Sequence, residues 1–139
     1  MLKIGPQVAQ HFSLPIASIV HQGTSIACLS TRSSIWILDS SSSDHMTDMP
    51  DIFSSLQQSS IHTHVIVANG SRAIVNGIGN VIISPTITLS SVLYVPSFPF
   101  NHISIRKLIK DLHCSVVFSS FSVIIQDIET KTSIGGGHE

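Results

Sequence analysis

The residues best suited to catalysis lie where a short apolar run ends in a carboxylate that a serine-rich segment follows. Residues 35–38 are Ile-Trp-Ile-Leu, Asp39 follows them, and four serines follow Asp39. Two carboxylates placed side by side can share one proton, so that one activates a water molecule while the other protonates a carbonyl oxygen. Asp39 is therefore a candidate for one half of such a pair.

Aspartic proteases present each catalytic Asp in a strand-to-loop motif of the form Asp-Thr/Ser-Gly. The hydroxyl of the second residue braces the loops, and the Gly lets backbone amides approach the carboxylates. Asp39 and Ser40 fit this motif, whereas Ser41 occupies the Gly position. A β-carbon at position 41 is expected to strain the loop or to displace its amide from the carboxylate. The cost is on the order of 1–3 kcal/mol if the backbone angle is unusual.

The chain contains one such motif, because Asp127 also ends an apolar run but is followed by Ile128 and Glu129. An active enzyme would therefore be a symmetric homodimer with one Asp39 from each subunit. The alternative is a serine-rich surface turn whose Asp makes only local hydrogen bonds to the backbone. Taken alone, the three loop residues favour this second interpretation.

The composition of the chain predicts a single folded domain. The chain has 139 residues, of which 42% are hydrophobic and 11% charged, and its mean hydropathy is +0.38. This length accommodates one domain of ordinary size. The formal net charge of -1 gives no electrostatic footprint for nucleic acid or for an anionic membrane, so neither partner is expected.

The chain is expected to lie inside the cell, most simply in the cytoplasm. Its apolar runs are far shorter than the ~20 residues that a membrane-spanning helix needs. The N-terminus lacks the pattern of a secretory signal. The two cysteines, Cys28 and Cys114, have no partner nearby in the sequence, which indicates free thiols in a reducing compartment.

Short β-branched runs separated by turn residues predict a mainly β fold, a small barrel or sandwich with one short helix. Residues 1–34 are expected to be a flexible Ser/Thr-rich leader, residues 35–112 the barrel, and residues 113–139 an additional hairpin that runs into a further region. The predicted strands are residues 35–38, 65–68, 73–75, 79–83, 87–89, 92–95, 114–118 and 123–126.

Two local patterns mark a turn and a helix. Asn69-Gly70 predicts a hairpin with a two-residue type I′ turn. Residues 76–79, Asn-Gly-Ile-Gly, suit a bend, a bulge or a mobile tip. Apolar residues at helical spacing predict a helix over residues 101–112, with Asn101 or Ser104 as its cap.

The eight histidines raise the question of a metal site. His62 and His64 alternate on one predicted strand face, and His45, His113 and Cys114 could in principle join them. No Cys-x-x-Cys or His-x-x-x-His pattern accompanies these residues, so no metal and no cofactor is expected. Cys114 lies in an apolar run without a catalytic partner pattern and is predicted to be a buried core residue.

A larger set of residues carries a resemblance to a known family. These residues share short motifs in a constant order along the chain: Trp36-Ile37-Leu38-Asp39-Ser40, Asp44-His45-Met46-Thr47, Ala68-Asn69-Gly70-Ser71, Gly77-Ile78-Gly79, Leu89-Ser90-Ser91-Val92-Leu93-Tyr94-Val95-Pro96, Asn101, Ser104, Lys107-Leu108, Cys114-Ser115-Val116, Gln126-Asp127, Ile134-Gly135 and Gly137-His138-Glu139. Residues 36–139 thereby resemble the protease-like β-barrel segment of copia-type retrotransposon Gag-Pol polyproteins, running toward the pre-integrase region.

The resemblance implies a retropepsin-like barrel that cuts the polyprotein as a homodimer, with Asp39 as catalytic acid and Ser40 as its bracing hydroxyl. Either the hairpin at Asn69-Gly70 or the 77–79 region would form the flap over the substrate. Family members usually have Gly after Asp-Ser, where this chain has Ser41. Two functions therefore stay open: a polyprotein-processing endopeptidase, or a non-catalytic structural or interaction module of a degenerate element.

Overall fold

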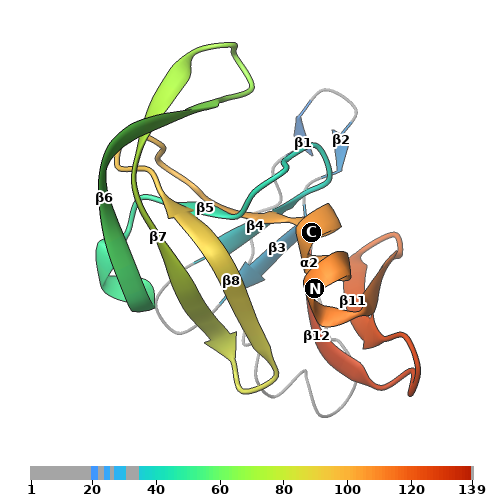
Figure 1. Ribbon diagram of the computed structural model, residues 1–139. Helices are drawn as coiled ribbons and strands as arrows, with labels where there is room; N and C mark the ends of the chain where they lie inside the picture. Colours follow the sequence, from blue (N-terminus) through green and yellow to red (C-terminus); the bar gives the residue numbers. More distant parts are fainter. Residues whose placement is uncertain (1–19, 22–23, 26, 31–34, 139) are drawn as a thin grey trace.

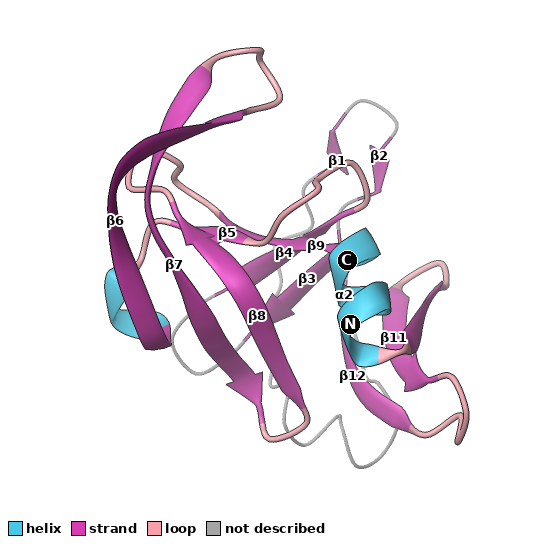
Figure 2. Cartoon of the chain, viewed as in Figure 1, coloured by secondary structure: helices cyan, strands magenta, loops and turns pink. Residues whose placement is uncertain are grey.

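One continuous curved sheet of ten strands makes up most of the described chain (Figures 1 and 2). The computed structural model describes residues 20–21, 24–25, 27–30 and 35–138, with side chains for residues 35–60 and 63–137. The strands are β1 (Val20–His21), β2 (Thr24–Ser25), β3 (Ala27–Ser30), β4 (Ile35–Asp39), β5 (Met46–Thr47), β6 (Phe53–Ile66), β7 (Arg72–Ser84), β8 (Ile87–Tyr94), β9 (Asn101–Ser104), β10 (Cys114–Phe118), β11 (Ser122–Asp127) and β12 (Ser133–His138). The predicted mainly β fold is confirmed.

The sheet order is β10-β11-β12-β3-β4-β9-β5-β8-β7-β6, and β1 pairs separately with β2. Figure 1 shows β6, β7 and β8 as one curved wall, β11 and β12 on the other side, and the helix α2 (Ile105–Leu112) between them. Apolar side chains from both sides fill the core. Its fully buried members include Trp36, Ile87, Leu89, Ile103, Leu108 and Ile125. Burial of each such side chain contributes about 1.5–3 kcal/mol.

The middle of the sheet joins segments that are far apart in the sequence. Strand β9 pairs in parallel with β4, and the register places Asp39 opposite Ser104. On its other side β9 pairs with β5 through Met46 and His102. Because β9 has a neighbour on each side, its backbone is fixed next to the end of β4 and to the loop that follows.

The β6–β7 hairpin is longer than the sequence predicts. Strand β7 is continuous, so the separately predicted strands 73–75 and 79–83 belong to one element, and the prediction of a mobile tip at residues 76–79 is wrong. A β-carbon on Gly79 would overlap the carbonyl oxygen of Ser55, so glycine there permits the close approach of β6. The bulge alternative is supported, because the pairing of β7 with β8 shifts register between Gly79 and Val81.

The tip of this hairpin is a three-residue turn rather than a type I′ turn. Gly70 has a φ of 82°, whereas Asn69 is not among the described non-glycine residues with positive φ. The amide of Gly70 donates to Val67 O at 2.8 Å, and the amide of Val67 donates to Ser71 O at 3.0 Å. This pattern fits a turn closed by one left-handed glycine, so the predicted hairpin is present with a different turn.

The predicted helix over residues 101–112 is half right. Residues 101–104 form β9, because they pair with β4, and the helix begins only at Ile105. Ser104 caps it, since its hydroxyl accepts from the amide of Lys107 at 3.2 Å. The helix has eight residues and ends at Leu112, and its cap residue His113 has a φ of 48°. Within the described residues no helix is long and apolar enough to cross a membrane.

The C-terminal part extends the sheet. The predicted pair of strands is present as β10 and β11, and the unpredicted β12 follows on the other edge of β11. Strand β12 then meets β3 through His138 and Cys28. The predicted leader over residues 1–34 falls largely outside the described residues, but its described part includes β3, which pairs along β4. The three-part division of the chain stays a prediction.

Candidate functional site

Asp39 is the last residue of β4 and is partly buried where the strand meets the loop of residues 40–45. Burial alternates along β4, so that Trp36 and Leu38 point into the core. These two anchors, together with the pairing to β9, fix the direction in which the strand delivers the carboxylate. The structure thus places Asp39 at a strand-to-loop junction, as the sequence predicts.

Ser41 is the direct partner of the Asp39 carboxylate. Both its backbone amide, at 2.8 Å, and its hydroxyl, at 2.6 Å, donate to Asp39 Oδ1. The expectation that a β-carbon at position 41 strains the loop is wrong, because the described non-glycine residues with positive φ do not include Ser41. The expectation that its amide is displaced is wrong as well. What the serine adds to the loop is a second hydrogen-bond donor.

The other oxygen of the carboxylate faces a histidine that the sequence analysis did not single out. His102 Nδ1 lies 3.3 Å from Asp39 Oδ2. The imidazole packs edge-on against Phe98, with ring centroids 4.8 Å apart. The prediction of a helix over residues 101–112 concealed this contact. Successive side chains of a strand point to opposite faces, whereas those of a helix follow a period of about 3.6 residues. The cluster of aromatic residues directly before Asn101 is the sequence signal that could have indicated it.

Asp39 is held in its ionised form. Burial raises the pKa of its carboxyl group, but the hydroxyl and amide of Ser41, the neighbouring His102 and the amide of Ser42 outweigh this effect, so the pKa lies below its ordinary value. Burial conversely lowers the pKa of His102, although the Asp39 carboxylate partly opposes the shift. At neutral pH the pair therefore consists of a carboxylate and a neutral imidazole. Ser41 bonds to Asp39 and not to the imidazole, which is not the arrangement of a serine nucleophile with its base.

A buried histidine holds the rest of the loop against the helix. His45 is 1% exposed, and its Nδ1 accepts a hydrogen bond from the amide of Ser104 at 3.0 Å. The hydroxyl of Ser104 donates to Ser42 O at 2.7 Å. Burial lowers the pKa of His45 to about 4, and the nearby Lys107 adds to this effect. His45 is thus a buried hydrogen-bond acceptor that links the loop to the start of the helix.

A second buried polar contact ties β5 to β9. The Thr47 hydroxyl and Asn101 Oδ1 lie 2.6 Å apart, and Asn101 Nδ2 donates to Ile35 O at 3.1 Å. Both side chains are nearly inaccessible, so their hydrogen bonds offset a desolvation cost of about 1–3 kcal/mol for each group. Together with the His45 contacts, they fix both ends of the loop that follows Asp39.

The other candidate residues lie apart from this site. Ser40 is exposed, and its predicted bracing role requires a partner subunit, so that role stays a prediction. Asp127 accepts hydrogen bonds from the amides of Glu129 and Thr130 within its own turn. Cys114 is fully buried, as predicted, and burial raises the pKa of its thiol.

The histidines named for a metal site are not gathered by the fold as far as the structure describes them. His45 is buried in the core, whereas His64 is exposed on β6. The side chain of His62 lies outside the described residues. Among the residues that were described, no three His, Cys, Asp or Glu side chains come close enough to hold a metal ion.

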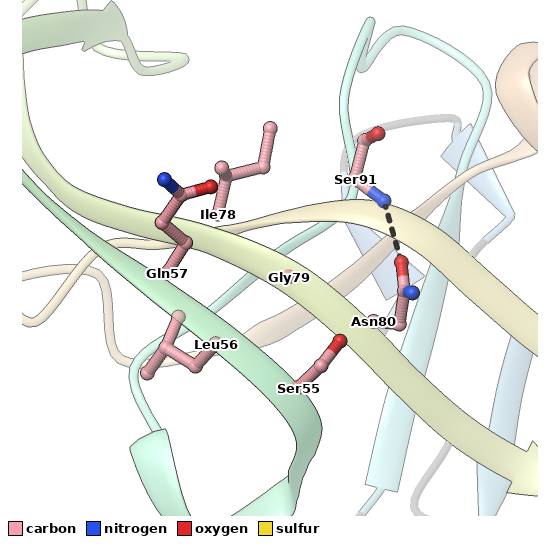
Figure 3. A pocket seen from close by; sticks show the side chains of 7 residues that line it. All are labelled: Ser55, Leu56, Gln57, Ile78, Gly79, Asn80 and Ser91. Carbon is pink, nitrogen blue, oxygen red and sulfur yellow. Dashed lines mark hydrogen bonds between the residues drawn. The ribbon is translucent and has the colours of Figure 1, made fainter.

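A shallow open hollow of about 390 Å³ lies over β6, β7 and β8 (Figure 3). Its lining is mixed polar and apolar, and consists of Ser55, Leu56, Gln57, Ile78, Gly79, Asn80 and Ser91. Asn80 Oδ1 accepts from the amide of Ser91 at 3.4 Å across it. Neither Asp39 nor His102 lines this hollow, and it brings no titratable side chains together. The Asp39 loop is therefore the stronger candidate site.

Comparison with known proteins assigns the chain to a protein family. Residues 36–113, more than half of the chain, match the family described as "Pol polyprotein, beta-barrel domain". The chain belongs to this family. The matched residues of this Pol polyprotein β-barrel domain run from β4 to the end of α2 and include the whole Asp39 loop, with Ser41 and His102.

A protein of Saccharomyces cerevisiae described as "Putative transposon Ty5-1 protein" is similar to part of this chain. The two are 43% identical over 75 residues, which is 54% of this chain and 50% of the yeast protein. The chain thus spans about half the length of the curated relative that it matches. No solved structure matches the chain significantly. The family and the relative support the predicted identity of the chain as a retrotransposon Gag-Pol segment.

Ser41 offers a direct test of what controls the Asp39 carboxylate. Ser41→Ala and Ser41→Gly both remove the hydroxyl donor, so both should raise the pKa of Asp39, as measured by ¹³C NMR titration of its carboxyl group. Ser43→Ala is the matched control, because the Ser43 hydroxyl donates to Asp44 and not to Asp39. An effect seen with Gly but not with Ala would instead assign the influence of Ser41 to backbone strain.

Proposed function

We propose that this domain is the polyprotein-processing aspartic endopeptidase of a copia-type retrotransposon, or descends from one. The observation that carries the proposal is the ionised carboxylate of Asp39 at a strand-to-loop junction, with backbone amides directed at it. In the proposed reaction, Asp39 carboxylates from two subunits share one proton, one activates a water molecule, and the other protonates the scissile carbonyl. The substrate is the parent polyprotein.

The hairpin tip of residues 67–71 is the better of the two predicted flaps. The 77–79 region is held within β7, whereas the tip lies at the free end of the long hairpin. Val65 and Val67 near this tip pack against the same buried cluster as Phe98, which contacts His102 next to Asp39. One apolar cluster therefore packs both with residues near the proposed flap and with the phenylalanine beside His102.

A non-catalytic structural or interaction module is the second candidate, and a specific contact favours it. A shared proton requires one Asp39 carboxyl group to stay protonated, whereas the Ser41 hydroxyl stabilises the ionised form. Two carboxylates at about 3 Å raise one pKa strongly, which works against this effect. The balance between the repulsion of the two carboxylates and the hydrogen bond from Ser41 decides whether the assembled site can hold its shared proton.

Sedimentation equilibrium of the purified chain tests the proposed function, because one subunit supplies only one Asp39. We expect a monomer–dimer equilibrium, with cleavage of a peptide from the parent polyprotein that increases with the dimer fraction. A chain that stays monomeric over the whole measurable concentration range, and cleaves nothing, would favour the non-catalytic module.

A further inference from the structure

His102 occupies a fixed position beside Asp39 and has no role in the mechanism described so far. Its strand, β9, pairs with β4 on one side and with β5 on the other, so its backbone cannot shift freely. Two phenylalanines lie near its ring. Phe98 lies edge-on at 4.8 Å, and Phe100 lies at 6.2 Å between ring centroids. The imidazole is therefore oriented by packing before any partner or substrate binds.

Within the described part of the chain, Asp39 is the ion-pair partner that faces Nδ1 of this ring. Among the described side chains, His102 Nδ1 is the buried nitrogen or oxygen atom without a hydrogen bond of good geometry. Asp39 Oδ2 lies 3.3 Å from it, within ion-pair distance. Because an ionised carboxylate only accepts hydrogen bonds, the neutral imidazole must carry its proton on Nδ1 to interact favourably. Such contacts are often long in an unliganded site and shorten in the complex.

The two oxygens of Asp39 have separate partners. Oδ1 accepts two hydrogen bonds from Ser41, and Oδ2 faces His102. Among the described charged or titratable groups, His102 is the one whose charge shifts the pKa of Asp39, and Asp39 is the one whose charge shifts the pKa of His102. Lys107, Asp111 and Asp44 act instead on His45. The Asp39–His102 pair can therefore be treated as one isolated titrating unit.

We propose that His102 is a positioning residue for Asp39, an imidazole that orients the carboxylate through Oδ2 and keeps it ionised. The consequence for catalysis rests on the proposed endopeptidase function. On acidification, a proton from solvent adds to the free ring nitrogen, and the resulting imidazolium pairs with the Asp39 carboxylate, which makes that carboxylate a weaker base. A weaker base is less able to take a proton from the attacking water. Cleavage should therefore fall on the acid side as His102 becomes protonated.

Three variants test the pair by NMR titration, without reference to cleavage. Asp39→Asn should lower the pKa of His102, because the carboxylate that favours imidazolium is gone. His102→Phe keeps the aromatic packing but lacks the nitrogen, and should raise the pKa of Asp39. Asp44→Asn, a charge removal in the same loop, should leave His102 unchanged. An unchanged His102 pKa in folded Asp39→Asn, or an unchanged Asp39 pKa in folded His102→Phe, would overturn the proposal.

The cleavage assay separates this proposal from the proposed function. If the titrations show the coupling but the wild-type chain dimerises and cleaves nothing, the endopeptidase function fails and the positioning of Asp39 by His102 stands. If the chain cleaves its substrate, His102→Phe should move the acid limb of the pH–rate profile to lower pH. An acid limb that does not move would contradict the role of His102, whatever the absolute rate of the variant.

Discussion

Asp39→Asn is expected to remove cleavage while the domain stays folded. General acid–base groups contribute about 10²- to 10⁴-fold to a rate, and an amide can neither share a proton nor activate water as a carboxylate does. The asparagine oxygen can still accept from the amide and hydroxyl of Ser41. We therefore expect the free energy of unfolding to change by no more than about 1.5 kcal/mol, the typical net value of one hydrogen bond.

The matched control for this substitution is Asp44→Asn. Asp44 lies in the same loop, where it accepts a hydrogen bond from the hydroxyl of Ser43 at 2.9 Å. Its substitution by Asn removes one negative charge from the loop, as Asp39→Asn does. Cleavage should stay within a few-fold of wild type in this control. Urea unfolding of all three proteins shows whether the loop is intact. Undiminished cleavage by Asp39→Asn would exclude Asp39 as the catalytic acid.

Acidification should destabilise the domain through His45. The pKa of this buried imidazole is lowered from 6.5 to about 4 in the folded chain, so the unfolded chain takes up the proton first. Stability is then lost as the pH falls below about 6.5, and the loss levels off below about pH 4. At about 1.4 kcal/mol per pKa unit, this one group accounts for about 3 kcal/mol. The lowered pKa of His102 acts in the same direction.

His45→Asn separates this effect from the general acid response. The amide oxygen of asparagine can take the position of Nδ1 and accept from the amide of Ser104, but it does not titrate in this range. Urea unfolding between pH 7 and pH 4 should show a clearly flatter pH dependence in this variant, even if its smaller side chain lowers stability overall. His64→Asn, on the exposed face of β6, is the control. Equal slopes in His45→Asn and wild type would contradict the structural role of His45.

The sequence predicted the parts of the fold that depend on local patterns. The continuous apolar run of residues 35–38 marked β4, and Ser104 was one of the two caps predicted for the helix. Strand β6 was found only in part, because residues 53–60 are rich in Ser and Gln and lack apolar alternation. Pairing with β7 makes them a strand, and this is a tertiary effect that no local window contains.

The candidate site was predicted in its central residue but not in its partners. Asp39 was identified from its place after an apolar strand, whereas His102 comes next to it only because β9 pairs in parallel with β4. The parallel pairing also explains the misassigned helix start, since the helical spacing came from residues 105–112 and residues 101–104 carried no local strand signal of their own. For Ser41, the motif predicted a cost in backbone strain. The structure shows a hydrogen-bond donor instead.

The most direct test of the central claim is a subunit-mixing experiment, because each subunit of the proposed enzyme supplies one Asp39. Wild-type and Asp39→Asn chains are mixed at a constant total concentration, and sedimentation verifies that they dimerise equally. If the site needs both carboxylates, activity should follow the square of the wild-type fraction, about one quarter at an equal mixture. A linear dependence, with about one half of the activity at an equal mixture, would contradict a catalytic site shared between two subunits.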